Sequence, residues 1–352
     1  MKPNLKLNLK NLFKRDTTPV KRGVRGPFIS GSCSVTGIML HVIAALIPIM
    51  IWAVYLFGVR VLVVTAVSVA SALGTETLLT LAIYKKPKIS DLTAVVTGLM
   101  LAMTLPAAVP LWIPLAGGVL AIGIKQLFGG TGRNLLNPAL FAHTVLTLVF
   151  GKLIIYTAPL TKLPIFENVG AELAAESPMA ALTAGRFPSE TLFESFFGRT
   201  GGTIGEVSAV LIIAGAAFLM IRKVISYKIP VAYLLTVAVI SYVFPKIDVD
   251  ATTFALYSLI SGGVLFAAVF MATDHTTSPC TTLGQIIYGV GCGVLTMLLR
   301  YSGLFYDGAY PAVLIMNEFA RPIDSLAFSL TVPVKKKKAA KTAAKTEGAE
   351  IK

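Results

Sequence analysis

Ten apolar runs constrain the fold of this chain more than any other feature. A helix rises 1.5 Å per residue, so about 20 apolar residues are needed to cross the hydrocarbon core of a bilayer. Apolar and aromatic residues make up 55% of the 352 residues and only 14% are charged, whereas soluble globular chains carry about 25% charged residues. The sequence therefore predicts an all-α polytopic membrane protein and argues against a soluble enzyme.

The runs predict ten transmembrane helices, five on each side of a polar insert. We expect these helices at residues 38–57, 61–84, 92–105, 112–126, 138–155, 207–221, 229–244, 254–271, 283–300 and 311–328. The chain then divides into a basic tail (1–34), a first five-helix membrane repeat (35–155), the insert (156–205), a second five-helix membrane repeat (206–330) and a lysine-rich tail (331–352).

The charges between the runs predict the orientation. Residues 1–28 hold eight basic groups and one acidic group, and residues 335–352 hold seven lysines and two glutamates. Ten crossings with both termini in the cytoplasm put the short basic loops inside and the acidic insert outside, as the positive-inside rule requires. We therefore expect a multi-pass protein of the inner or plasma membrane. The two tails carry most of the net charge of +14, and we expect them to face anionic lipid. We therefore expect no nucleic-acid partner.

Two similar segments open the fifth and the tenth run. The fifth begins Asn137-Pro138-Ala139-Leu140, and the tenth begins Tyr310-Pro311-Ala312-Val313. Each of these runs is the last of its group of five. In the predicted topology the fifth run begins on the cytoplasmic side of the membrane and the tenth begins on the outer side. This pattern is typical of an inverted five-plus-five repeat.

Two polar segments, residues 128–138 and 271–279, lie between apolar runs. Irregular backbone at membrane depth is tolerated only where it lines a cavity or is buried in protein. Helix N-termini that face such a cavity attract anionic groups, such as phosphates or a reduced flavin ring. We expect the two segments to converge, although two ordinary cytoplasmic loops are the alternative. The candidate cofactor-binding residues are Thr131, Arg133, Asn134, Asp274 and Thr277.

Ionisable residues within the runs also require a partner or a wet cavity. Glu76 lies eight residues before the end of the second run, so it is either a group that neutralises a moving cation or one half of a structural ion pair. The three histidines and three cysteines are scattered, so we expect no metal site. We also find no constellation of catalytic residues.

Five blocks of sequence resemble one family. They are Asp91–Leu105, Ala121–Ala139, Gly205–Ser208, Phe270–Pro279 and Tyr306–Asn317. In this order they resemble the D subunit of the Rnf ion-translocating oxidoreductase and, less closely, the B subunit of the sodium-pumping NADH:quinone oxidoreductase. The resemblance runs from about Ser34 to Asp324 and does not cover the two basic tails.

The resemblance implies a fold similar to urea transporters and a membrane complex with other Rnf subunits. It implies FMN linked by a phosphoester to a hydroxyl side chain on the outer side, and a second, non-covalent flavin such as riboflavin. Electrons would pass between ferredoxin and NAD, coupled to Na+ or H+ movement, so the chain would be a translocase subunit that is not active alone. A non-redox transporter or channel of the same fold and a flavin-less assembly subunit are the alternatives.

The flavin attachment motif of the family differs in this chain. The family motif reads Ser-Gly-Ala-Thr-Pro-Leu, and the aligned stretch here is Ala174-Ala175-Glu176-Ser177-Pro178-Met179. Ser177 replaces the threonine but keeps the hydroxyl that a phosphoester requires, and Pro178 biases it toward an extended backbone. The resemblance therefore implies Ser177 as the covalent FMN site, with Glu176 as an unfavourable neighbour of the phosphate.

Overall fold

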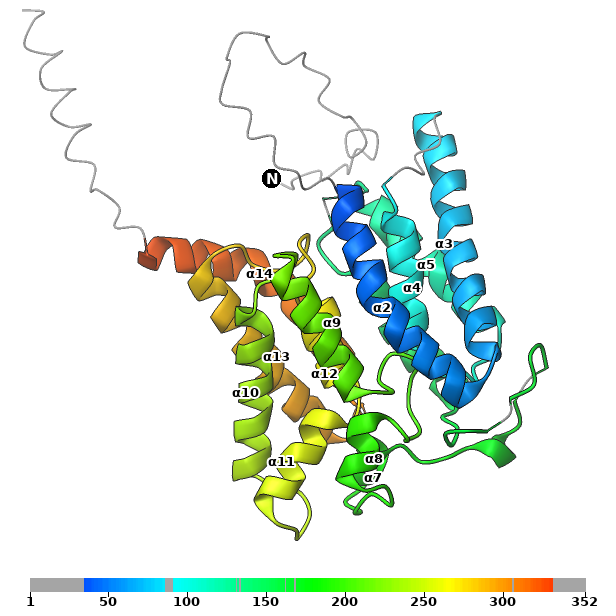
Figure 1. The fold of residues 1–352 in the computed structure, drawn as a ribbon. Coiled ribbons are helices and arrows are strands. Elements are labelled where there is room, and N and C mark those ends of the chain that lie inside the picture. Colours follow the sequence, from blue (N-terminus) through cyan, green and yellow to red (C-terminus); the bar gives the residue numbers. More distant parts are fainter. Residues whose placement is uncertain are drawn as a thin grey trace, which may run out of the picture.

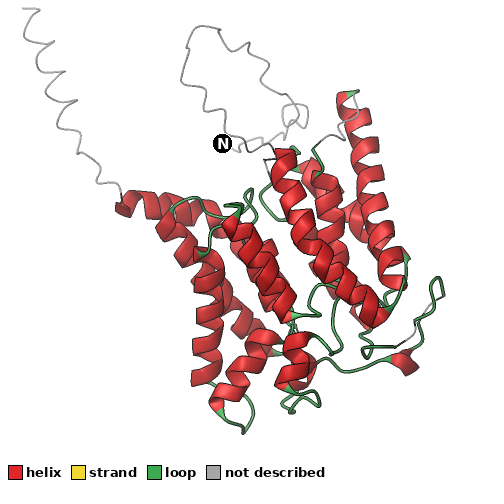
Figure 2. Cartoon of the chain, viewed as in Figure 1, coloured by secondary structure: helices red, strands yellow, loops and turns green. Residues whose placement is uncertain are grey.

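The computed structural model describes residues 35–331 apart from 86–90, 131, 133, 162, 168 and 306. Its first group of helices comprises α2 (Val35–Phe57), α3 (Arg60–Tyr84), α4 (Thr93–Met103), α5 (Trp112–Leu127) and α6 (Pro138–Phe150). Two short helices follow in the insert, α7 (Pro178–Thr183) and α8 (Leu192–Phe197). The second group comprises α9 (Ala209–Ile221), α10 (Lys228–Val243), α11 (Ala251–Ile260), α12 (Val264–Phe266), α13 (Thr282–Ser302) and α14 (Ala309–Thr331). The described residues contain no β-strand, and Figure 2 shows helices joined by loops.

The all-helical prediction is confirmed for the described residues, and each apolar run contains a helix, some of which begin at a local sequence signal. α6 illustrates this, because the Asn137 side chain accepts hydrogen bonds from the backbone N–H groups of Ala139 and Leu140 at 3.0 and 3.3 Å. Pro138 occupies the first helical position, where its missing N–H leaves no helical hydrogen bond unmade.

The expected helix at residues 254–271 is broken. α11 ends at Ile260, and the chain bends by 60° before α12, which continues as a π-helix over Ala267–Met271. Gly262 has a φ of +76°, a conformation that other residues rarely adopt. A Cβ on Gly263 would lie 2.6 Å from Tyr310 Oη. The break therefore depends on two glycines packed against the start of α14, a contact that periodicity along the chain does not reveal.

The two groups of helices have matching neighbours. In the first group α3 packs against α4 and α5, and α5 against α6; in the second group α10 packs against α11 and α13, and α13 against α14. The groups meet where α2 contacts α9 (Figure 1). They also meet where α6 contacts α14. One apolar core extends across this junction and includes buried side chains from both groups, among them Met103 and Phe266.

One fully buried arginine in each group binds backbone carbonyl groups. Arg60 Nε donates to Ala107 O at 2.9 Å, and its Nη1 donates to Pro164 O at 2.6 Å, which joins the insert to the first group. In the second group, Arg300 Nη1 donates to Ser258 O at 2.8 Å. These contacts satisfy carbonyl groups that irregular backbone leaves without helical partners.

The bundle has two distinct ends. The described chain begins at Val35 and ends at Thr331 on the same end, which we call the tail face (Figure 1). α7 and α8 lie at the opposite end, which we call the insert face. The insert is therefore on the other side of the bundle from both ends of the described chain.

The helices carry apolar surface suited to lipid. α2, α3 over Arg60–Ile83 and α13 are each long and apolar enough to cross a bilayer, and α11 with α12 and its π-helical extension forms a bent pair that passes the same test. Five shorter helices are also apolar. Large apolar side chains such as Leu78 and Leu235 point away from the core and are mostly exposed. The chain is a multi-pass membrane protein.

Candidate functional site

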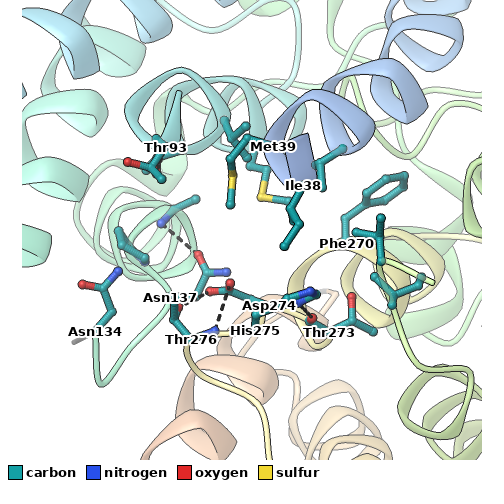
Figure 3. Close-up of a pocket in the computed structure, with 18 of the residues that line it drawn as sticks. Ile38, Met39, Thr93, Asn134, Asn137, Phe270, Thr273, Asp274, His275 and Thr276 are labelled. Carbon is teal, nitrogen blue, oxygen red and sulfur yellow. Dashed lines mark hydrogen bonds between the residues drawn. The ribbon is translucent and has the colours of Figure 1, made fainter. Parts of the chain in front are cut away.

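A cavity of about 260 Å³ lies near the tail face between the two groups of helices (Figure 3). Its apolar wall comes from α2, α4 and the π-helix, and includes Ile38, Met39, Met100 and Phe270. Its polar wall comes from the turns before α6 and after the π-helix. An apolar chamber with a few convergent polar groups is the usual form of a small-molecule site, and this volume is close to the lower end of their range.

The two polar segments that we expected to converge both line this cavity. Gly132, Asn134 and Asn137 come from the first segment, and Thr273 and Asp274 come from the second. Of the candidate cofactor-binding residues, Asn134 and Asp274 therefore face one cavity. Thr277 is buried beside Asp274 without lining the cavity, and Thr131 and Arg133 lie outside the described residues.

Asn134 contributes a hydrogen-bond acceptor that the protein leaves unused. Its side chain is buried, and its Oδ1 has no hydrogen-bond partner among the described residues. A buried polar atom without a partner is unfavourable by about 1–3 kcal/mol. A bound molecule with an N–H or O–H group at this position would remove that penalty.

Asp274 holds the second polar segment in shape. Its Oδ2 accepts hydrogen bonds from Thr276 Oγ1 at 2.9 Å and from Thr277 Oγ1 at 3.3 Å. None of the ion pairs of the described residues includes Asp274. Hydroxyl groups therefore satisfy its carboxylate, and Thr277 acts by positioning Asp274.

Lys125 is a cavity residue that the sequence does not single out. Its Nζ donates to Glu76 Oε1 and to Thr93 Oγ1, both at 2.7 Å, and its side chain is 2% exposed. From the sequence, Lys125 is only one of several basic residues that set the orientation. The structure instead places a buried cation beside the cavity, with Glu76 as its counter-charge.

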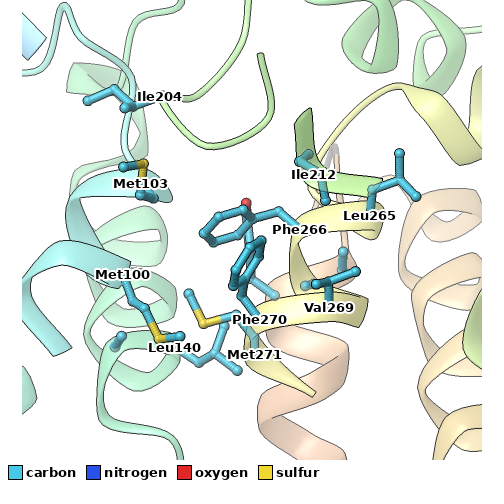
Figure 4. Close-up of a cluster of buried hydrophobic side chains, with 14 of the residues drawn as sticks. Met100, Met103, Leu140, Ile204, Ile212, Leu265, Phe266, Val269, Phe270 and Met271 are labelled. Atoms are coloured by element: carbon cyan, nitrogen blue, oxygen red, sulfur yellow. The ribbon is translucent and has the colours of Figure 1, made fainter. Parts of the chain in front are cut away.

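An apolar layer separates this cavity from the insert face. Figure 4 shows Met100, Met103, Phe266 and Phe270 gathered in it. The Phe266 and Phe270 rings lie 5.0 Å apart, and Phe270 lines the cavity on one side of the layer. On the other side, the Phe266 ring lies 3.0 Å from where a Cβ on Gly205 would be, next to Glu206.

Ser177 lies on the insert face, away from the cavity. Its backbone is extended, as expected before a proline, with φ −79° and ψ 152°. Its Oγ caps α7 by accepting from the Ala180 N–H at 3.2 Å, and the side chain is only 5% exposed. The extended backbone that Pro178 predicts is therefore present, but the hydroxyl is buried. Glu176 forms an ion pair with Arg186, so its charge is partly neutralised.

Comparison with known proteins agrees with the five sequence blocks. The sequence model of the NQR2, RnfD, RnfE family matches residues 24–330. The chain belongs to this family. Membership confirms the resemblance that the five sequence blocks indicate.

Three curated relatives are matched over nearly their whole length, and each is the D component of its complex. That of the Na(+)-translocating ferredoxin:NAD(+) oxidoreductase complex of Acetobacterium woodii is 38% identical over 295 residues, covering 83% of this chain and 88% of that protein. That of the ion-translocating oxidoreductase complex of Stutzerimonas stutzeri is 34% identical, with 83% and 90% covered. That of the proton-translocating ferredoxin:NAD(+) oxidoreductase complex of Clostridium ljungdahlii is 31% identical, with 88% and 94% covered.

Proposed function

We propose that this chain is the D-type membrane component of an Rnf complex, in which it relays electrons through flavin between ferredoxin and NAD and couples this relay to Na+ or H+ movement. Similar relatives named for Na+ and for proton translocation support the coupling to either ion. The observation that carries the flavin role is the unpartnered acceptor of Asn134 in a buried, largely apolar cavity.

The tail-face cavity fits a non-covalent flavin such as riboflavin. The isoalloxazine ring has an apolar body and a polar edge that contains an N–H group and carbonyl oxygens. Asn134 Oδ1 would accept from that N–H group, and Met39, Val42 and Met100 would pack against the body of the ring. A bound flavin supplies the redox chemistry, and Lys125, paired with Glu76, borders the cavity that would hold the ring.

Ser177 is the proposed site of covalently linked FMN on the insert face. Its hydroxyl is the group that a phosphoester requires, and Arg186 offsets the charge of Glu176 next to it. Mass spectrometry of the peptide from Leu163 to Arg186 tests this assignment in protein made with its native partners. We expect the mass of an attached FMN, and an unmodified peptide would remove Ser177 from the site.

The proposed orientation puts both termini in the cytoplasm and the insert outside. The position of α7 and α8 opposite both ends of the described chain supports it, together with the charge of the loops. The matching neighbours of α3 and α10 support an inverted repeat of ten spans, similar to urea transporters.

The visible absorption spectrum of the purified protein distinguishes this function from its rivals. A flavin spectrum is expected before and after acid precipitation, because covalent FMN stays with the protein and non-covalent flavin is released into the supernatant. In Asn134→Leu, the released flavin should fall severalfold while the covalent flavin remains. A colourless protein within an assembled complex would instead support a flavin-less assembly role or a non-redox transporter.

A further inference from the structure

Glu206 lies near the insert face, and its carboxylate forms no ion pair within the described part of the chain. It lies in the turn before α9 and is half-buried. Its Oε1 accepts from Tyr310 Oη at 3.0 Å, and its Oε2 accepts from the Thr203 N–H at 3.4 Å. None of the ion pairs of the described residues includes Glu206, so hydrogen bonds alone support its charge.

The charged groups around Glu206 do not neutralise it. Arg300 Nη2 donates to Asp307 Oδ1 at 2.7 Å, so these two residues balance one another. The ring of His143 packs on Tyr310. Its Nδ1 has no hydrogen-bond partner among the described residues, so a protonated His143 would have an N–H group without an acceptor. Ionised Glu206 gives the cluster one negative charge in excess, and burial together with Asp307 raises the pKa of Glu206 to about 8 when no cation is bound.

A small cavity of about 10 Å³ lies against Glu206, roughly the space of one water molecule or one ion. Ser195 and Ser261 line it, both 5% exposed, and the Oγ of each has no hydrogen-bond partner among the described residues. The residues around the cavity therefore include the Glu206 carboxylate and two buried hydroxyl groups that the protein leaves unused. Their chemistry is that of a site for a hard cation, which oxygen ligands bind.

The break in the second group brings a helix end to the same cavity. α11 ends at Ile260, which lines the cavity with Ser261 and Gly262. The C-terminal end of a helix carries partial negative charge, and discontinuous membrane helices use such ends to coordinate cations. Arg300 binds the carbonyl groups of Ser258 and Ser261, but its charge is already balanced by Asp307. Both the helix end and Glu206 therefore favour a cation and disfavour an anion.

We infer that Glu206, Ser195 and Ser261 form a binding site for one small monovalent cation of the Na+ type on the insert-face side of the apolar layer. A single uncompensated carboxylate matches one positive charge, whereas sites for divalent cations draw on more carboxylate and carbonyl oxygens. Such a site would give the proposed coupling a place where the ion binds. The binding itself does not depend on the proposed function, and only its biological role does. Ser177 lines the same cavity, so a phosphoester there would add negative charge next to the cation.

Hydrogen exchange followed by mass spectrometry tests the site in the purified complex. Exchange is compared in NaCl and in choline chloride at equal ionic strength, with the peptides that contain residues 200–206 and 258–263 as reporters. At Na+ concentrations about ten times the dissociation constant, binding should slow local opening about tenfold. Glu206→Gln should abolish this protection and Ser261→Ala should weaken it, whereas the exposed Glu172→Gln should retain it.

Each outcome decides the inference. Equal exchange of both peptides in the two salts for the unmodified complex would overturn it, and so would Na+ protection that persists in Glu206→Gln. Protection that follows acidification but not Na+ would replace the cation by a proton and also overturn it. If Glu206→Gln fails to assemble, the salt comparison in the unmodified complex and in Ser261→Ala still decides. Flavin content is measured separately, so failure of this site and failure of the proposed flavin role are distinguishable.

Discussion

Lys125 Nζ lies 2.7 Å from Glu76 Oε1, and both side chains are almost completely buried. Of the two roles that the sequence leaves open for Glu76, this geometry favours the structural ion pair. Removing one partner of a buried pair is unfavourable by about 3–5 kcal/mol, because the other charge stays buried without compensation. We therefore expect Glu76→Gln to lower the amount of assembled complex and ion transport together, as measured by native gels and by transport into vesicles.

A compensating change sharpens this prediction. Replacing both partners, as in Glu76→Leu with Lys125→Met, removes both buried charges and should restore most of the assembled complex. Full assembly of the single Glu76→Gln variant with loss of ion transport would contradict the structural role and support direct contact with the moving cation.

Variants of Ser177 separate its two tasks, capping α7 and bearing FMN. Ser177→Thr keeps a hydroxyl and should keep the covalent flavin. Ser177→Ala should lose it and should also weaken α7 by about 1 kcal/mol through loss of the cap. Flavin fluorescence of the denatured protein in a gel measures the linkage, with the exposed Ser189→Ala as control. Fluorescence that survives in Ser177→Ala would locate the linkage on another residue.

The break between α11 and α12 should not accept a side chain at Gly263. An added Cβ would lie 2.6 Å from Tyr310 Oη and 2.7 Å from Asp307 Oδ2. Overpacking of this kind is unfavourable by about 1–3 kcal/mol. Gly263→Ala should lower the thermal unfolding midpoint of the purified complex. Gly123→Ala, in α5 with nothing within 4 Å of its new methyl group, should leave it unchanged or raise it.

Acid should loosen α8 through its capping box. The Thr191 N–H and Thr191 Oγ1 both donate to Glu194 Oε2, at 2.9 and 2.8 Å, and these bonds lower the pKa of Glu194. Since the folded pKa lies below the unfolded one, the stabilisation is complete above the unfolded pKa and is lost as pH falls through the folded pKa. Hydrogen exchange of residues 192–197, corrected for intrinsic rates, should accelerate there, and Glu194→Gln should lack this acid-dependent step.

Cysteine labelling tests the orientation. In a background with Cys33, Cys280 and Cys292 replaced by alanine, a cysteine introduced by Ser189→Cys should react with an impermeant maleimide in intact cells. One introduced by Thr331→Cys should react only after the membrane is permeabilised. The basis is that Ser189 is exposed in the insert and Thr331 ends α14 on the opposite face. The reverse pattern would reject the orientation.

Much of the fold follows from the sequence, because hydrophobic runs and helix caps are local signals. The expected helix at residues 112–126 is found at Trp112–Leu127, and that at 283–300 is found at Thr282–Ser302. The broken helix escaped prediction because its cause is not local. Gly262 and Gly263 are ordinary residues of an apolar run until Asp307 and Tyr310, far along the chain, occupy the space where their side chains would be.

The candidate site was less predictable for the same reason. Asn134 and Asp274 stand out as polar residues between apolar runs, and both line the tail-face cavity. Lys125 and Glu76 lie 49 residues apart, and no pattern in the sequence shows that they pair or that the lysine borders a cavity. Ser177 combines both cases. Its extended backbone conformation is predictable from Pro178, whereas the burial of its side chain depends on how the insert packs.

The short α12 and its π-helical extension bear on how the chain is made in the membrane. Helices of fewer than about 12 residues are marginal on their own, and α12 with the π-helix comprises only Val264–Met271. Every one of these residues is buried, against neighbours that include α9, α10 and α14. During biosynthesis this stretch reaches the bilayer before α14 has been translated. We therefore expect it to complete its structure only after the last helix has entered, so that the centre of the molecule is one of the last parts to form.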